Sequence, residues 1–154
     1  MRVSRLAYKP RRPSASKVVS LALLLAGMAL LSTSPPAVAK RDTIPPKFAG
    51  LKSATTCVPG PVGGGRTTSY HLNWDPATDN RTLSSQIVYD VYQATAPGGE
   101  KYSAPTYTTG PGVTSFDTPP LPTDQVFYFV VRARDRAGNR DSNTVERQGQ
   151  NLCV

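Results

Sequence analysis

The clearest pattern in this chain is an alternation of apolar and other side chains within residues 125–139. Every second residue from Phe127 to Ala133 is apolar, whereas the intervening set ends in Arg132 and Arg134. Because successive side chains of a strand point to opposite faces, this pattern predicts a half-buried β-strand. The residues that follow, Asp-Arg-Ala-Gly-Asn, predict a hairpin turn.

Shorter alternating stretches recur along the chain, with turn residues between them. Tyr70, Leu72 and Trp74 alternate with polar residues, and Tyr89 and Val91 do the same farther along. Further strands are expected near Phe48 and Leu51, over Val113–Phe116 and over Asp141–Gln148. Gly and Pro interrupt the connecting segments, and no long stretch has a helical period.

The sequence therefore predicts an all-β domain, a sandwich of two antiparallel sheets. The side chains expected to lie buried between the sheets are Trp74, Tyr89, Phe129 and Val131. The loop of residues 75–86 is long and polar, and we expect it to lie at one end of the sandwich.

The first 39 residues have the order of a secretory signal peptide. Basic residues precede an uncharged apolar run, Val18–Leu31, of 14 residues. That run is shorter than the roughly 20 residues that a membrane-spanning helix needs, although an uncleaved anchor is the alternative. Ala37-Val38-Ala39 is a small-residue cleavage site. We predict that residues 1–39 are a signal peptide cleaved after Ala39, and that residues 40–154 are one secreted domain without a membrane span.

Removing the leader changes the meaning of the net charge. The full chain has 18 Lys and Arg against 10 Asp and Glu, a net of +8. Six of the bases and none of the acids lie in residues 1–39, so residues 40–154 have 18 − 6 = 12 bases, a net of +2. This balance does not predict a nucleic-acid partner. A local arginine cluster, Arg132, Arg134, Arg136 and Arg140, is either a solvated face or a site for an anionic polymer.

Three features within residues 42–148 resemble the fibronectin type III family. Trp74 closes an alternating strand and precedes Asp-Pro-Ala, as in the family's second strand. Tyr-Asp-Val-Tyr at residues 89–92 is similar to the third strand, and Leu121-Pro122 leads into residues 127–133 as in the entry to the sixth. The resemblance implies an immunoglobulin-like, seven-stranded antiparallel sandwich of fibronectin type III type. It implies little about activity, because this fold hosts many unrelated roles.

Cys57 and Cys153 are the only cysteines of the chain. An even count in an exported protein favours one disulfide between them, with a reactive or intermolecular thiol pair as the alternative. In the topology that the resemblance implies, the first and last strands run the same way along an open edge. Both cysteines are then expected at the same end of the domain.

The implied topology also gathers oxygen-bearing side chains at the opposite end, from the lead-in segment, the 75–86 loop and the 135–141 turn. Calcium takes six to eight hard oxygen ligands, so this end is a candidate calcium site. The predicted ligands are Asp42, Asp79, Asn80, Asp135 and Asn139; Asp75 and Asp141 belong to the same loops. The alternative is an ordinary set of turn formers neutralised by the arginines at 81, 136 and 140. No other cofactor is predicted.

No motif in the sequence predicts catalysis, so we do not expect an enzyme. His71, the only histidine, falls on the outward side of its strand without a nucleophile motif. Glu100 and Glu146, the only glutamates, lie in different segments, so they do not form an obvious acid–base pair.

Two tyrosines are candidates for a binding surface. Tyr92 and Tyr128 are expected to point outward, where exposed rings could stack on a sugar or pack on a partner; ordinary cross-strand packing is the alternative. We therefore expect a secreted, non-catalytic binding or adhesion module for an extracellular protein or polysaccharide. The alternative function is a carbohydrate-associated accessory module of extracellular polysaccharide degradation, which the resemblance to modules of secreted glycosidases implies.

Overall fold

The structure, a computed structural model, describes residues 40–58 and 65–153. The predicted signal peptide, residues 1–39, lies outside the described residues. The described residues are 38% strand and 3% helix, which confirms the prediction of an all-β protein. In the part of the chain that is described, no helix has the length and apolar character needed to cross a membrane.

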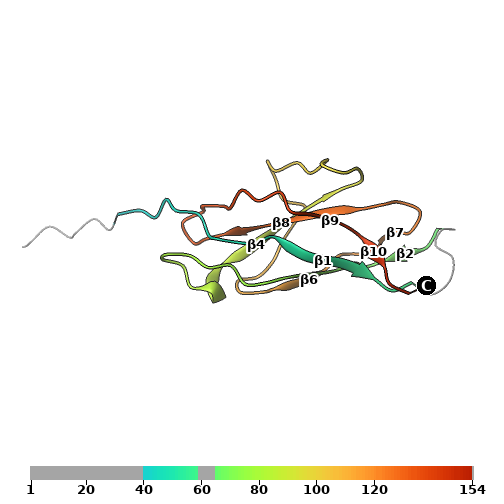
Figure 1. The fold of residues 1–154 in the computed structure, drawn as a ribbon, viewed down its shortest axis with the longest axis horizontal. Helices are drawn as coiled ribbons and strands as arrows, with labels where there is room; N and C mark the ends of the chain where they lie inside the picture. The colour runs from blue at the N-terminus through green and yellow to red at the C-terminus, as the bar shows by residue number, and fades with distance from the viewer. Residues whose placement is uncertain (1–39, 59–64, 154) are drawn as a thin grey trace, which may run out of the picture. The chain divides into compact units, whose positions relative to one another are not determined.

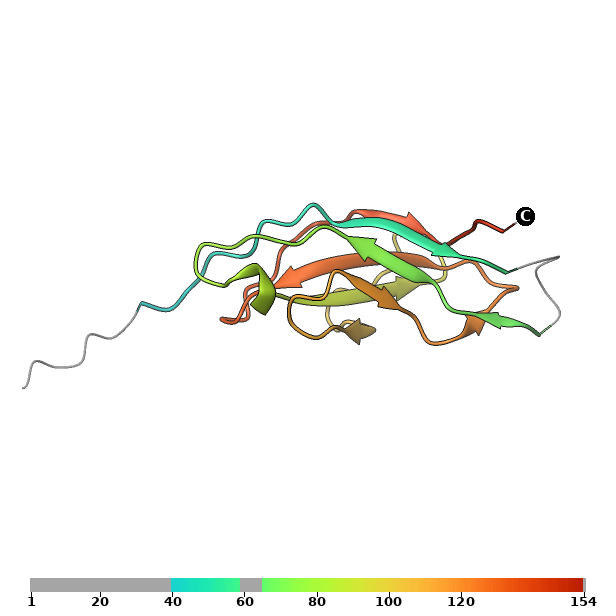
Figure 2. The ribbon, with the colours of Figure 1, turned by 90° about the horizontal axis from the view of Figure 1, so that it is seen from below.

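Two four-stranded sheets contain most of the strands (Figures 1 and 2). The first sheet, in spatial order, consists of β10 (Gln150–Asn151), β1 (Leu51–Thr56), β3 (His71–Trp74) and β6 (Ser115–Asp117). The second consists of β5 (Tyr107–Thr108), β4 (Val88–Ala94), β8 (Tyr128–Arg134) and β9 (Glu146–Gln148). A separate two-stranded pair joins β2 (Thr67–Thr68) to β7 (Leu121–Pro122). The pairing of β1 with β10 is parallel, and the other pairings among these strands are antiparallel.

The described residues thus form ten strands in three sheets, rather than the seven strands expected. The strand expected from Tyr70, Leu72 and Trp74 begins only at His71, and the Tyr70 backbone N–H donates to Thr118 Oγ1 at 2.9 Å. The pair of β2 and β7 is therefore separate from the first sheet. The long polar loop of residues 75–86 includes one short 3₁₀ helix, η1 (Ser84–Gln86).

The last strand divides at Gly149, where the chain changes sheets. β9 pairs with β8 in the second sheet, and β10 pairs with β1 in the first. The Gly149 backbone donates to the Phe127 carbonyl at 2.8 Å. A Cβ at this position would lie 2.9 Å from Cδ1 of Tyr70, so the close approach of the chain to that ring favours glycine.

The core lies between the two large sheets, as the alternation predicts. Trp74 is 2% exposed, and Tyr89, Phe129 and Val131 are fully buried. The Trp74 and Tyr89 rings pack at a centroid distance of 5.3 Å. The Tyr89 hydroxyl accepts a hydrogen bond from the Ala77 N–H at 2.8 Å, which satisfies its one polar atom inside the core.

The outer face of the second sheet is less exposed than the alternation predicts. Val130 is fully buried and Tyr92, opposite it on β4, is 1% exposed. The segment of residues 95–106 folds back over this face (Figure 1), and its Tyr102 ring packs edge-on against Tyr92 at 5.1 Å. The prediction that Tyr92 is an exposed ring is therefore wrong. Tyr128 is partly exposed, and its place in a binding surface stays a prediction.

The predicted disulfide is confirmed, because Cys57 and Cys153 are bonded across a sequence separation of 96. The change of sheet at Gly149 places the C-terminal segment beside β1, where Leu152 N–H donates to the Thr56 carbonyl at 2.9 Å. The Cα atoms of the two cysteines lie 4.8 Å apart. The bridge therefore joins the end of the first strand to the end of the described chain.

Candidate metal centre

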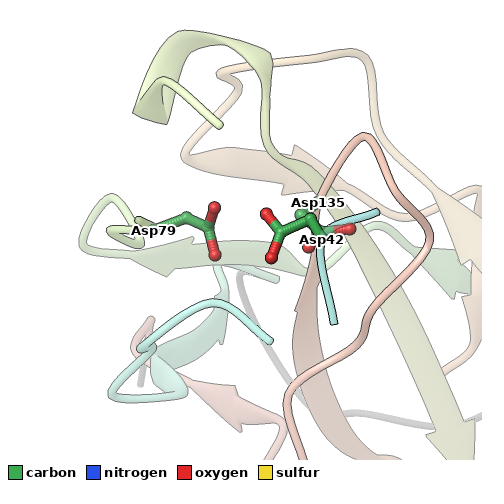
Figure 3. Close-up of side chains that lie close together, drawn as sticks. All are labelled: Asp42, Asp79 and Asp135. Carbon is green, nitrogen blue, oxygen red and sulfur yellow. The ribbon is translucent and has the colours of Figure 1, made fainter. Parts of the chain in front are cut away.

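Three segments that are distant in sequence meet at the end of the domain opposite the disulfide. The lead-in segment pairs with the loop after β3, since Lys47 N–H donates to the Thr78 carbonyl at 2.7 Å and Thr78 N–H returns a bond at 3.0 Å. This pairing places Asp42, in the lead-in segment, near Asp79, which follows Thr78. Asp135 follows the last residue of β8 at the same end (Figures 1 and 3).

The carboxylates of Asp42, Asp79 and Asp135 face one another (Figure 3). One oxygen from each lies within 4.8 Å of the other two. Asp135 is buried, and Asp42 and Asp79 are partly buried. Three like charges at this separation repel, and they do so more strongly as water is excluded.

Asp42 and Asp79 each bind their own turn with one carboxylate oxygen. Ile44 N–H donates to Asp42 Oδ1 at 3.1 Å, and the N–H groups of Arg81 and Thr82 donate to Asp79 Oδ2 at 2.9 and 2.8 Å. Asp42 Oδ2 and Asp79 Oδ1 are buried and accept no hydrogen bond from the described residues. Because burying an unpartnered charged oxygen is costly, these two atoms are suited to a hard cation.

Asp135 is held by Asn139 in the turn after β8. Asn139 donates its backbone N–H to Asp135 Oδ1 and its Nδ2 to Asp135 Oδ2, both at 2.7 Å. The same Nδ2 lies 3.5 Å from the Ile44 carbonyl, which links the turn to the lead-in segment. Asn139 therefore positions a cluster member with its amide donor, whereas the sequence predicted it as a ligand.

The two neighbouring aspartates, Asp75 and Asp141, are not members of the cluster. Asn80 is exposed, and its side chain makes no hydrogen bond to the described residues. Asp75 pairs with Lys52 at 3.0 Å on the surface. Asp141 accepts the Ala133 N–H at 3.2 Å. Three of the five predicted ligands, all aspartates, thus lie together.

Two of the three arginines that could neutralise this end have other partners. Arg81 donates Nη1 to the Lys40 carbonyl at 2.7 Å, and Arg140 donates Nε to Asp90 at 2.8 Å. Within residues 40–58 and 65–153, no Lys or Arg forms an ion pair with Asp42, Asp79 or Asp135. No cationic side chain of the described residues therefore contacts the three aspartates and balances their negative charge.

Asp90 forms a second charged network, which sequence analysis did not predict. It is fully buried on β4 and accepts Arg134 Nε at 2.9 Å, Arg140 Nε at 2.8 Å and the Thr108 hydroxyl at 2.8 Å. Burial alone would raise the pKa of Asp90, but the hydrogen bonds from Arg134 and Thr108 and the charges of Arg134 and Arg140 outweigh it and lower the pKa. Two of the four clustered arginines thus serve an internal ion pair rather than an anionic ligand.

His71 is exposed, as predicted, and its Nδ1 lies 2.7 Å from Asp117 Oδ1 on the neighbouring strand. Both cysteines are in the disulfide, so neither is a free thiol. His71 has no hydrogen bond to a serine hydroxyl among the described residues. This arrangement is typical of a surface cross-strand pair.

Comparisons of the chain with protein-family models, with curated proteins and with solved structures gave no match.

Proposed function

We propose that residues 40–154 are a secreted, non-catalytic binding or adhesion module of fibronectin type III type, and that calcium stabilises one end of it. The observation that carries the calcium site is the pair of buried, unpartnered oxygens, Asp42 Oδ2 and Asp79 Oδ1, beside the buried Asp135. These oxygens come from a lead-in segment, a loop and a turn. A cation bound there links three segments that otherwise share few bonds.

The strand arrangement supports the choice of family. If β3, β4 and β8 are taken as the second, third and sixth strands, the second and third lie in different sheets and the third pairs with the sixth. A sandwich of immunoglobulin-like topology has this arrangement. The disulfide supports export, because such bonds persist in oxidising compartments.

Three carboxylates, a loop carbonyl and solvent would together supply the coordination that calcium prefers. The Ile44 carbonyl lies 3.5 Å from the Asn139 amide that holds Asp135, so a backbone oxygen is close to the cluster. A site with three carboxylates and a flexible loop has the composition of the weaker extracellular calcium sites, with dissociation constants of about 10⁻⁴ to 10⁻³ M. Such a site is filled outside cells and largely empty inside them.

The polysaccharide alternative depended on two tyrosine rings that could stack on a sugar. Tyr92 cannot do so in this structure, because it is 1% exposed and packed against Tyr102. Tyr128, which is partly exposed, and the loops are the parts of the surface through which a polysaccharide could still bind. We therefore propose the general binding or adhesion role as the function that the geometry supports best.

Export and binding can be tested with two measurements on protein recovered from the culture medium. Intact mass is expected to show a chain that begins at Lys40 and is two hydrogens lighter than the reduced form. A retained leader or a reduced pair of thiols would contradict the assignment to the exported class.

The purified protein should be retained on cells or extracellular matrix material and released by EDTA. Retention on chitin, cellulose or cell-wall material that Tyr128→Ala abolishes would instead favour the polysaccharide alternative. If neither kind of material retains the protein, the binding role is wrong. Tyr107→Phe is a suitable control, because Tyr107 makes only one side-chain hydrogen bond, at 3.2 Å to Gln93.

A further inference from the structure

The segment of residues 95–106 crosses the outer face of the second sheet and is attached there by a few specific contacts (Figure 1). Tyr102 lies between Tyr92 on β4 and Arg132 on β8, with the Arg132 guanidinium 3.6 Å from its ring centroid. On the other side, Gly98 N–H donates to Glu146 Oε2 on β9 at 2.6 Å. The contacts therefore link the segment to three strands of the second sheet, β4, β8 and β9.

Glu100, in the same segment, has an unusual environment for a carboxylate. It is 7% exposed, and neither of its carboxylate oxygens accepts a hydrogen bond from another of the described residues. The Glu146 carboxylate lies beside this segment, because Glu146 Oε2 accepts the Gly98 N–H at 2.6 Å, two residues before Glu100, and the two carboxyl groups interact. Two ionised carboxylates cannot bond to each other, because each is only an acceptor. One proton between them converts that contact into a hydrogen bond.

We propose that Glu100 and Glu146 share one proton and that this carboxyl pair is an acid-dependent latch, which holds residues 95–106 on the second sheet. The proton comes from solvent, resides on Glu100 and is donated to a Glu146 oxygen. The other Glu146 oxygen keeps the bond from the Gly98 N–H. No group other than the proton is gained or lost, and the latch does not involve the three aspartates of the candidate metal centre.

The surrounding charges agree with this assignment. Arg132, whose guanidinium lies over the Tyr102 ring, donates Nε to the Asn143 carbonyl at 2.9 Å and forms no ion pair with either glutamate among the described residues. The other titratable groups on this face are the phenols of Tyr92 and Tyr102, which are neutral at moderate pH, the exposed Lys101 and the phenol of Tyr128. Farther along β4 and β8, Asp90 pairs with Arg134 and Arg140 rather than with either glutamate. No cation in direct contact therefore offsets a second negative charge.

Burial and the neighbouring Glu146 carboxylate raise the pKa of Glu100. An acid whose pKa is higher in the folded state than in the unfolded state stabilises the fold at pH below its unfolded value. That contribution is lost as pH rises through the folded value. The latch is therefore expected to be closed in acid and to loosen as pH rises from about 4.3, the usual pKa of glutamate, through the raised value.

The chain offers a direct test, since Glu100 and Glu146 are its only glutamates. Glutamate labelled with ¹³C at Cδ gives two resonances, which can be followed from pH 3 to pH 9 in the intact protein. The Glu100 resonance is expected to titrate above the usual glutamate range and to move to lower pH in Glu146→Gln. The proposal is overturned if Glu100 titrates near 4.3, or if its titration is the same in Glu146→Gln.

Hydrogen exchange provides the second readout, because it reports whether the segment opens. After correction for intrinsic rates, protection of the Gly98 amide is expected to fall by up to about tenfold per pH unit above the Glu100 pKa. Glu100→Gln, whose amide can donate to Glu146 at every pH, should show protection that does not vary with pH. Asp124→Asn, which changes an exposed carboxylate, should behave as wild type. Equal pH dependence of protection in wild type and Glu100→Gln would show that the pair is no latch.

Discussion

Cys57→Ser is expected to lower the free energy of unfolding by up to about 4.7 kcal/mol, the chain-entropy value for a loop of about 100 residues. The two cysteines are separated by 96 positions, so the bridge closes residues 57–153 into one loop in the unfolded chain. Typical domains are stable by only about 5 to 15 kcal/mol, so this loss is a large share of the total. Urea denaturation of the variant and the wild type measures it.

Cys153→Ser and the double variant serve as controls for that prediction. All three changes remove the same bond, so their losses should be nearly equal rather than additive. Wild-type protein treated with a reductant should match them. A loss below about 1 kcal/mol in every form would show that the bridge contributes little to stability, contrary to the expected range.

Asp90→Ala is expected to cost about 3 to 5 kcal/mol, the range for removing one partner of a buried ion pair. Asp90 is fully buried, and its removal leaves Arg134 and Arg140 without the acceptor that both share. Lys52 and Asp75 provide a matched surface pair, with side chains 57% and 64% exposed. Asp75→Ala should therefore change stability by no more than about 1 kcal/mol. A similar effect of the two substitutions would contradict the role assigned to the Asp90 network.

The pH dependence of stability tests the same network with a defined sign. The folded pKa of Asp90 is lowered, so its contribution is present above the unfolded value, about 3.9, and is lost as pH falls through the folded value. Wild type should therefore lose stability in acid more steeply than Asp90→Asn does. The sign is opposite to that of Glu100, so the two effects can be separated by combining Asp90→Asn with Glu100→Gln.

Local alternation was sufficient to predict the core, and the reason lies in the sheets themselves. Trp74, Tyr89, Phe129 and Val131 lie on strands whose inner faces meet, so each side chain's direction follows from its place in the strand. The cysteine pairing was also predictable, because only two cysteines are present and they lie near the ends of the first and last strands.

The outer face could not be predicted in the same way. Tyr92 and Val130 are buried by residues 95–106, a segment with weak patterning whose path depends on Tyr102, Arg132 and Glu146. No periodicity connects Glu100 with Glu146, which are 46 positions apart. The fully buried Asp90 also looks like an ordinary outward residue in sequence, because its arginine partners come from β8 and from the following turn.

The candidate metal centre could be predicted in part, unlike the core, which was predictable, and the outer face, which was not. The aspartates could be selected because turn residues that follow strands meet at one end of a sandwich. The hydrogen-bond partners of the residues at this end could not be predicted from the sequence. Arg140 binds Asp90, and Asn139 donates its amide N–H to Asp135. Only the three-dimensional arrangement separates Asp42, Asp79 and Asp135 from the other loop aspartates.

Thermal unfolding in calcium and in EDTA tests the central proposal most directly. At 10 mM calcium and a dissociation constant of about 10⁻⁴ to 10⁻³ M, binding should stabilise the wild type by about 1.4 to 2.7 kcal/mol. The expected rise in melting temperature is several degrees, and magnesium should give a smaller one. Asp79→Asn should abolish the calcium response yet melt at or above the wild-type temperature in EDTA, because it removes one of three mutually repelling charges. An unchanged wild-type melting temperature, or an equal calcium response in Asp79→Asn, would contradict the proposal.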